Sequence, residues 1–174
     1  MHLQTHLMSG WCAANLIQLN ARERFLAMLM AVAPDLDGVT YLWSVKAYWA
    51  THHVYGHNLL YLTAVAGVLT LFCQHRLKSF ALFMVIGHLH LAMDLLGSGE
   101  GWTIPYWLPF DRKEYLWSWG WAFDSWQNKV AGLGFLLWTI GIAVYQKRTP
   151  LEYVMPKLDT QLVNLAQKLR RRKR

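Results

Sequence analysis

The stretch "THHVYGHNLL", Thr51 to Leu60, holds three histidines within six residues and then runs into a long apolar segment. The apolar segment predicts a membrane helix. Imidazoles at the mouth of such a helix are costly, because ionisable groups lose their water there, and they mark a candidate functional site by default. This stretch therefore predicts both a membrane-embedded helical fold and a site at one end of it.

The composition also indicates a membrane protein. Of the 174 residues, 55% are hydrophobic and only 16% are charged, against about 25% charged residues in a typical soluble domain. The chain has ten tryptophans, more than packing alone needs at this length. The mean hydropathy is only +0.16, so a substantial polar or aromatic part must accompany the apolar spans.

The apolar segments predict an all-α fold, a membrane-embedded helical bundle. Two N-terminal segments, 7–19 and 25–33, are shorter than the ~20 residues that a helix needs to cross hydrocarbon, so we expect short helices there. Longer apolar segments predict about three spans, and these lie at 58–74, 79–97 and 130–146.

The remaining segments complete this bundle. Residues 98–129 are rich in Gly, Trp and Pro, which predicts a loop with aromatic anchors at the membrane interface. Residues 157–170 place leucines at helical spacing with charges between them, which predicts an amphipathic helix lying on the membrane. We therefore expect one membrane-embedded domain, 1–150, followed by a basic amphipathic cytoplasmic tail, 151–174.

Basic residues gather at one end of this arrangement. The net charge is +7, and the C-terminal "KLRRRKR" holds six of the seventeen basic residues. If this tail shares a side with Arg22, Arg76 and Arg148, the positive-inside rule makes that side cytoplasmic. A basic tail can also bind nucleic acid. Beside apolar spans it more often contacts anionic lipid, so we expect membrane lipid as a partner and no nucleic acid.

The same folding brings histidines and aspartates to the opposite end. His57 lies 19 residues before residue 76, the centre of a predicted turn, and Asp94 lies 18 residues after it. At 1.5 Å per residue the two reach nearly the same depth. His53 and His57 are four residues apart, as are His90 and Asp94, so each pair shares a face if its segment is helical. The residues collected at this end are His6, Asp35, Asp37, His52, His53, His57, His90 and Asp94.

A mixed set of histidines and aspartates suits a divalent ion, zinc first, with manganese or iron as alternatives. Each part also has a simpler interpretation. A lone His88 is more often a satisfied polar group, Asp35 and Asp37 in "APDLDG" favour a turn, and His90 can pair with Asp94. Convergence from four separate segments is what favours a shared metal site.

These residues carry a resemblance to a known family. The matching pieces run in order over residues 5–110, and they resemble the YdjM-like family of membrane-bound metal-dependent hydrolases. The pieces are "TH" from Thr5, "PDLD" from Pro34, "HHVYGHN" from His52, "HLAMD" from His90 and "LPF" from Leu108.

The chain departs from the family in one element. The family usually shows "HRGxTHS" where this chain has "HHVYGHN", so His52 and His57 match its two histidines. The positions that differ are His53, Val54, Gly56 and Asn58. The difference keeps the implied ligand His57 and alters the part that would face a substrate. The resemblance implies an integral protein of a bacterial or archaeal cytoplasmic (inner) membrane. The folding described above puts the site on the side opposite the basic tail.

A more distant resemblance is to zinc-dependent phospholipases C and related zinc nucleases, which use an early "TH", a "PDxD" element and an "HxxxD" helix. It implies that Asp35, His57, His90 and Asp94 surround one ion, and that His6 and Asp94 help to hold a second. The later histidines of that pattern have no match after Asp94, so we expect no third metal.

Together these observations predict a membrane-bound metal-dependent hydrolase of a phosphoester, with a lipid as the natural substrate because the site opens at an apolar interface. Asp37 would orient a ligand or act as a base, and His52 or His53 would assist the leaving group. One alternative is a haem- or metal-binding membrane protein without hydrolysis, because paired histidines such as His57 and His90 can hold a haem. Another is an interaction protein whose basic tail binds a cytoplasmic partner.

Overall fold

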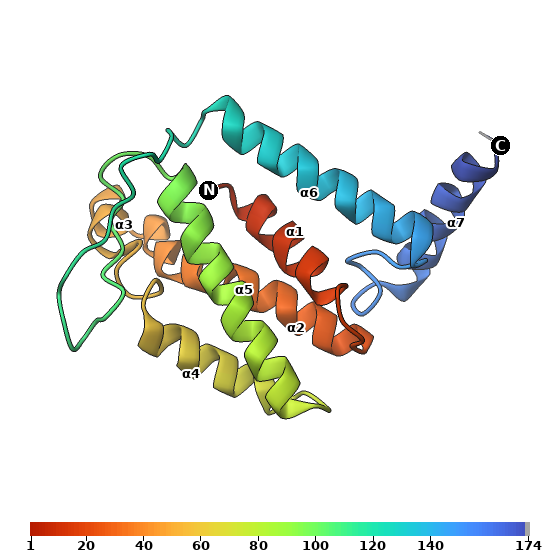
Figure 1. Cartoon of the computed structure of the whole chain (residues 1–174), viewed down its shortest axis with the longest axis horizontal. Coiled ribbons are helices and arrows are strands. Elements are labelled where there is room, and N and C mark those ends of the chain that lie inside the picture. Colours follow the sequence, from red (N-terminus) through yellow and green to blue (C-terminus); the bar gives the residue numbers. More distant parts are fainter. Residues whose placement is uncertain (173–174) are drawn as a thin grey trace.

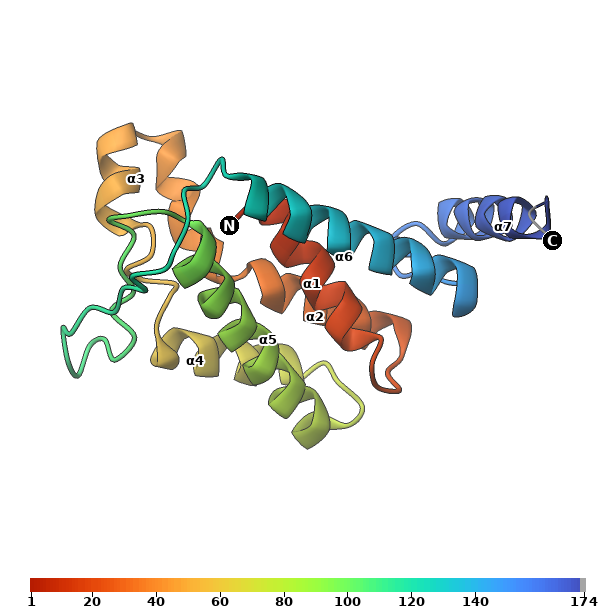
Figure 2. The same ribbon diagram turned by 45° about the horizontal axis from the view of Figure 1, so that its top comes forward.

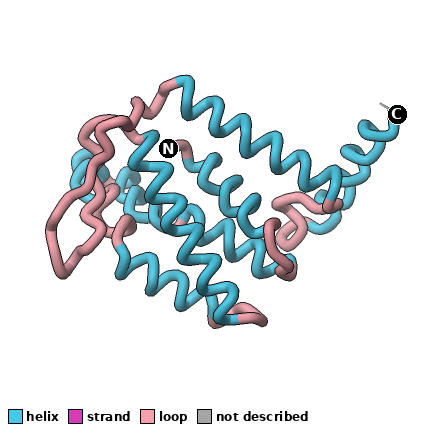
Figure 3. The backbone as a smooth tube through the Cα atoms, in the orientation of Figure 1, coloured by secondary structure: helices cyan, strands magenta, loops and turns pink. Residues whose placement is uncertain are grey.

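The computed structural model describes residues 1–172, and the last two residues of the basic tail, Lys173 and Arg174, lie outside that range. Within it the chain is all-helical apart from loops (Figures 1 and 3), and its nearest approach to a strand is an isolated bridge between Ile104 and Tyr115. This confirms the predicted all-α class. The elements are α1 (Leu3–Ala14), α2 (Ala21–Val32), η1 (Pro34–Leu42, a 3-10 helix), α3 (Val45–Thr51), α4 (Leu59–Thr70), α5 (Arg76–Gly97), α6 (Trp126–Tyr145) and α7 (Pro156–Arg172).

Two helices, α5 and α6, are long and apolar enough to cross a membrane, and α2 with η1 makes a third candidate span bent by 62°. The span expected at 58–74 is wrong in extent, because α4 is an apolar helix of only 12 residues. It begins at the cap formed by the Asn58 side chain, which accepts from the Tyr61 N–H at 2.9 Å. The third candidate span is therefore the bent α2–η1 pair.

The bundle is built around contacts of α1 and α5 with α2. At Gly10 the backbones of α1 and α2 come very close, since a Cβ there would lie 2.5 Å from Ala31 Cβ. Across α2, the buried side chains of Met30, Leu62 and Phe83 form part of the core between α2, α4 and α5. Figure 1 shows α6 running beside α1 on the side away from α4. The short N-terminal helices thus lie inside the bundle rather than on its edge.

One end of the bundle gathers the α1–α2 turn, the α4–α5 turn and the segment after α6 (Figure 1). Glu23 closes a capping box with Asn20, and its other oxygen accepts from the Gln74 N–H at 2.7 Å. Arg24 forms a two-pronged ion pair with Glu152. These contacts confirm that the regions of Arg22, Arg76 and Arg148 share an end, which we call the turn end. That this end is cytoplasmic stays a prediction.

The opposite end carries η1, α3 and the long loop 98–125 (Figures 1 and 2). The predicted loop over 98–129 is confirmed apart from its last residues, which begin α6. At the C-terminus, α7 confirms the predicted amphipathic helix, and the Arg170 guanidinium lies 4.9 Å from the Tyr145 ring centroid. The division into domains at residue 150 stays a prediction.

Candidate metal centre

Helix α5 carries two inward-facing polar residues one turn apart, His90 and Asp94, both fully buried. The Nδ1–H of His90 donates to the Ala31 carbonyl at 2.7 Å. That bond fixes the tautomer, because a carbonyl only accepts, and it leaves Nε2 with a free lone pair. His90 Nε2 lies 2.8 Å from Asp94 Oδ2. The predicted i, i+4 pair is therefore present, with Nε2 of His90 facing the carboxylate.

The loop before α4 supplies His57. Its backbone passes so close to η1 that a Cβ at Gly56 would lie 2.0 Å from the Pro34 carbonyl oxygen, so only glycine fits. Asp37 holds the loop from the other side. One oxygen accepts from the Gly56 N–H at 2.9 Å and from His57 Nδ1–H at 3.2 Å. Asp37 thus orients His57 and leaves its Nε2 free to face α5, a role the sequence predicted.

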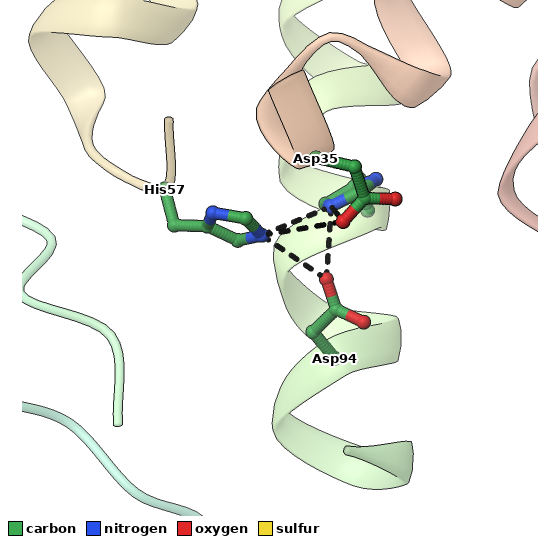
Figure 4. A group of neighbouring side chains, drawn as sticks. Asp35, His57 and Asp94 are labelled. Carbon is green, nitrogen blue, oxygen red and sulfur yellow. Dashed lines mark hydrogen bonds and ion pairs between the residues drawn. The ribbon is translucent and has the colours of Figure 1, made fainter. Parts of the chain in front are cut away.

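Asp35, in the first turn of η1, completes a group of four (Figure 4). Its Oδ1 lies 3.9 Å from His57 Nε2 and 3.6 Å from His90 Nε2. His57 Nε2 is 3.2 Å from His90 Nε2 and 3.3 Å from Asp94 Oδ2. All four ligand atoms lie within 4.8 Å of one another. Asp35 is 18% exposed at its side chain and the other three are at most 1% exposed, so the group opens only on the Asp35 side.

The electrostatics of this group call for a cation. Both Nδ1–H groups already donate elsewhere, so both Nε2 atoms face carboxylate oxygens, and each carries a lone pair once its imidazole is neutral. Among the described residues no group donates a hydrogen bond to Asp94 Oδ2, although the atom is buried. Such an arrangement is repulsive unless a positive charge sits among the four atoms. Ligands at ~2.0–2.2 Å from one ion stand about 3.3–3.6 Å apart, close to the spacing seen, so the group can hold a divalent ion.

Without a bound ion, a proton on His57 supplies part of this positive charge. Burial lowers the pKa of His57, but the carboxylates of Asp37 and Asp94 outweigh burial and raise the pKa to about 9. The carboxylates therefore favour a positive charge on or beside this imidazole. An ion that binds here must displace the proton from Nε2.

His6 lies beside the other oxygen of Asp94, as predicted. Its Nε2–H donates to Asp94 Oδ1 at 3.1 Å, and its ring stacks on His90 with centroids 3.8 Å apart. Ser98 Oγ donates to the same oxygen at 3.1 Å, and the α-amino group of Met1 also contacts it. Asp94 thus faces the four-residue group with Oδ2 and a separate polar cluster with Oδ1.

His52 and His53 lie at the mouth of the group. They are in a turn and not in a helix, so the helical face that His53 and His57 would have shared does not form. His52 Nδ1–H donates to the second oxygen of Asp37 at 2.7 Å. His53 has a left-handed backbone (φ 66) and stacks on His57 with centroids 4.2 Å apart. Its Nε2 is 3.9 Å from Asp94 Oδ2, and its buried Nδ1 has no partner within residues 1–172. Burial lowers the pKa of His53 to about 2, so this imidazole is neutral.

An aromatic residue that the sequence did not single out covers these histidines. The Trp102 ring centroid, from the long loop, lies 5.2 Å from that of His52 and 5.0 Å from that of His53. The only signal in the sequence was the general abundance of tryptophan in 98–129. His88, by contrast, is the satisfied polar group expected, with Nδ1 donating to the Met84 carbonyl at 2.7 Å and Nε2 accepting from the Tyr106 hydroxyl at 2.8 Å.

A family model described as "YdjM inner membrane protein" matches residues 1–156. The chain belongs to the YdjM inner membrane protein family. It is therefore an integral inner-membrane protein, which agrees with its apolar helices. The match covers all of the candidate site residues and ends at the first residue of α7.

No curated protein and no solved structure matches the chain. The distant resemblance to zinc-dependent phospholipases C stays a prediction. The family membership establishes the membrane location, and the chemistry of the site has to be argued from its own residues.

Proposed function

We propose that this protein is a membrane-embedded, metal-dependent hydrolase of phosphoesters. The observation that carries the proposal is the convergence of Asp35, His57, His90 and Asp94, with both imidazoles turned so that their Nε2 atoms face the carboxylates. Two nitrogens and two carboxylate oxygens suit zinc, and also manganese or iron.

A divalent ion bound there would polarise a phosphoryl oxygen and lower the pKa of a water molecule. The protein's residues do the rest. Asp37 holds His57 and His52 through their Nδ1–H groups, which keeps the ligand nitrogen aimed at the ion site. His90 is held in the same way by the Ala31 carbonyl. Asp35, the ligand that reaches the opening, faces the direction from which a substrate arrives.

Hydrolysis also needs a group that moves a proton. The water oxygen bonds to phosphorus, the bond from phosphorus to the alcohol oxygen breaks, and a proton ends on the departing alcohol. His53 is placed for this task, because it lies beside His57 and its buried Nδ1 has no partner within residues 1–172. His52 is the second candidate, since its Nδ1–H is held by Asp37 while Nε2 stays free of that bond.

His6 and the Oδ1 side of Asp94 are the residues we propose for a second ion, which would make Asp94 a bridging carboxylate. The geometry disfavours the alternative of a haem. Two axial histidines have to approach an iron from opposite faces of a planar ring. Here the two Nε2 atoms are 3.2 Å apart and carboxylate oxygens stand beside them, which leaves no room for a ring.

The test is turnover of soluble phosphoesters, p-nitrophenyl phosphate and bis(p-nitrophenyl) phosphate, by purified protein supplied with zinc or manganese. Asp35→Asn keeps the shape of the side chain and removes a ligand charge, so it should lower turnover by roughly 10²-fold or more. Asp111→Asn, at an exposed loop carboxylate of the same end, is the matched control and should change turnover little. A wild type that binds metal but hydrolyses neither compound would remove the phosphoester class and keep the metal site.

A further inference from the structure

The helical hairpin formed by η1 and α3, residues 34–51, lies at the site end of the bundle (Figure 2). It exposes an apolar surface. Between residues 38 and 51 the single charged residue is Lys46. The exposed large apolar side chains here are between 46% and 79% exposed, a density that water-facing surfaces rarely show. The main contributors are Leu36, Tyr41, Leu42, Trp43, Val45 and Trp49.

Two threonine hydroxyls of the hairpin, those of Thr40 and Thr51, point the other way, toward its own interior. The Thr40 and Thr51 hydroxyls lie 2.7 Å apart, and Thr51 also lies 3.2 Å from the Asp37 carbonyl oxygen. Ser44 caps α3 by accepting from the Ala47 N–H at 2.9 Å. The hairpin is thus a folded unit with polar contacts inside and apolar side chains outside, which suits an apolar surrounding rather than water.

The position of the hairpin identifies that surrounding as the membrane. Helix α2 and η1 are long and apolar enough for a membrane span only when they are taken together. Between them the chain bends by 62°. The bend lies at the end of the bundle where α5 finishes and α6 begins (Figure 1), which is where a bilayer crossed by these two helices meets water. Trp and Tyr side chains are enriched at that depth in membrane proteins. An apolar hairpin that turns aside there lies in the head-group layer.

The hairpin also borders the open side of the metal centre. Asp35, the one partly exposed member of the group, is in η1. Tyr48 of α3 stacks on His52 with centroids 4.7 Å apart, and Trp49 stacks on Trp102 with centroids 4.6 Å apart. A molecule that reaches Asp35 therefore passes residues that the hairpin holds in place.

We propose that the hairpin of residues 34–51 inserts into the head-group layer of the bilayer and opens the site to lipids of the same leaflet. The substrate is then a phosphoester whose alcohol or acyl part stays in the membrane while its phosphate enters beside Asp35. The insertion stands on the apolar surface, the bend and the depth of the hairpin. The identity of the substrate rests in addition on the proposed phosphoesterase function.

Insertion is tested without activity. A nitroxide spin label at Leu42→Cys is compared with one at Lys113→Cys, which lies in the charged loop run "DRKE" of the same end. Both are placed in a Cys12→Ala, Cys73→Ala background, in nanodiscs of phosphatidylethanolamine and phosphatidylglycerol. We expect the Leu42 label to be relaxed more by oxygen and the Lys113 label more by a water-soluble nickel chelate. A Leu42 label as accessible to nickel as the Lys113 label overturns the insertion.

The substrate route is tested with the double variant Leu42→Asp, Trp43→Asp, which places two charges in the inserted surface. Hydrolysis of phosphatidic acid or phosphatidylglycerol in nanodiscs should fall by about tenfold or more, and hydrolysis of p-nitrophenyl phosphate should stay within about twofold. Lys113→Asp should change neither. Equal losses on lipid and soluble substrates overturn the lipid route. A wild type inactive on every phosphoester refutes the proposed function, and the spin labels alone then decide the insertion.

Discussion

Both ends of the bundle bury carboxylates, and the two ends treat them differently. At the turn end, buried Glu23 accepts from the backbone N–H groups of Asn20 and Gln74, and Glu152 accepts from Arg24. Every one of these oxygens faces a donor. At the site end, Asp94 Oδ2 faces the Nε2 atoms of His57 and His90, whose Nδ1–H groups already donate elsewhere.

The difference separates a structural use of charge from a functional one. A carboxylate surrounded by donors stabilises the fold by itself, since its lost hydration is replaced by hydrogen bonds. A carboxylate oxygen that faces imidazole nitrogens, as Asp94 Oδ2 does, needs a positive charge beside it, from a proton or from a metal ion. Burial is similar at the two ends, with Glu23 at 1% and Asp94 at 2% exposure, so the direction of the neighbouring protons is what distinguishes the site.

The largest effect should come from Asp94→Asn, which keeps the shape and removes the charge between the two polar clusters. The ion or ions should be lost, and turnover should fall roughly 10³-fold or more, because several kcal/mol of transition-state stabilisation disappear. The check is steady-state turnover of a phosphoester with metal counted per chain.

The control for that variant is His88→Ala, on another face of the same helix. His88 bonds only to Met84 and Tyr106, so its loss should perturb α5 locally and leave the metal centre in place. Full metal and full turnover in Asp94→Asn would show that the two ends of the bundle do not differ in the way described.

The affinity for metal should depend on pH at the site end. Because the pKa of His57 in the ion-free protein is about 9, the ion displaces one proton at any lower pH. Below pH 9, each drop of one pH unit therefore weakens metal binding about tenfold, so the affinity falls about 100-fold from pH 8 to pH 6. A zinc titration against a chelating dye, corrected for the dye's own protonation, measures this. Equal affinity at the two pH values would mean that His57 is not a ligand.

Asp37→Asn sharpens the comparison, because Asp37 is a carboxylate of the site end that does have donors. It orients His57 and His52 rather than facing the ion, so its loss should weaken metal binding by about 10–100-fold without abolishing it. Thr51→Val is the matched control, since it removes a contact to the Asp37 backbone and spares the carboxylate. Loss of metal as complete as in Asp94→Asn would argue that Asp37 is itself a ligand.

The smallest effect on the site is expected at the turn end. Glu23→Gln keeps the volume but turns an amide toward backbone donors, which should cost about 1–3 kcal/mol of unfolding free energy. Bound metal and turnover should not change. The measurement is the thermal unfolding midpoint in detergent together with metal content. If Glu23→Gln also releases the ion, the two ends are coupled and the contrast between them fails.

Much of the site could be predicted because its signals are local or depend only on helix length. His90 and Asp94 are four residues apart in one helix, and the depth of His57 follows from counting residues to the turn. Family-like pieces added Asp35, in η1. The tautomers could not be predicted, because the acceptor that orients His90 is the backbone carbonyl of Ala31 in α2, which belongs to no sequence pattern.

The hairpin was also missed, for a different reason. Residues 34–51 have neither the length of a span nor a clear 3.6-residue period, and η1 is a 3-10 helix with a tighter repeat. Gly56 is a usable signal for this loop, although in the sequence it stands out only as a departure from the family pattern. Its lack of a side chain is what lets the histidine loop reach Pro34.

The central claim is that Asp35, His57, His90 and Asp94 hold a divalent ion, and metal analysis of the detergent-purified protein tests it most directly. Elemental analysis should give at least one ion per chain. X-ray absorption at that metal's edge should give nitrogen and oxygen ligands at ~2.0–2.2 Å and no sulfur. Asp94→Asn should lose the ion. A wild type that stays free of metal after dialysis against zinc, manganese and iron(II), or one whose ion persists unchanged in Asp94→Asn, would contradict the account.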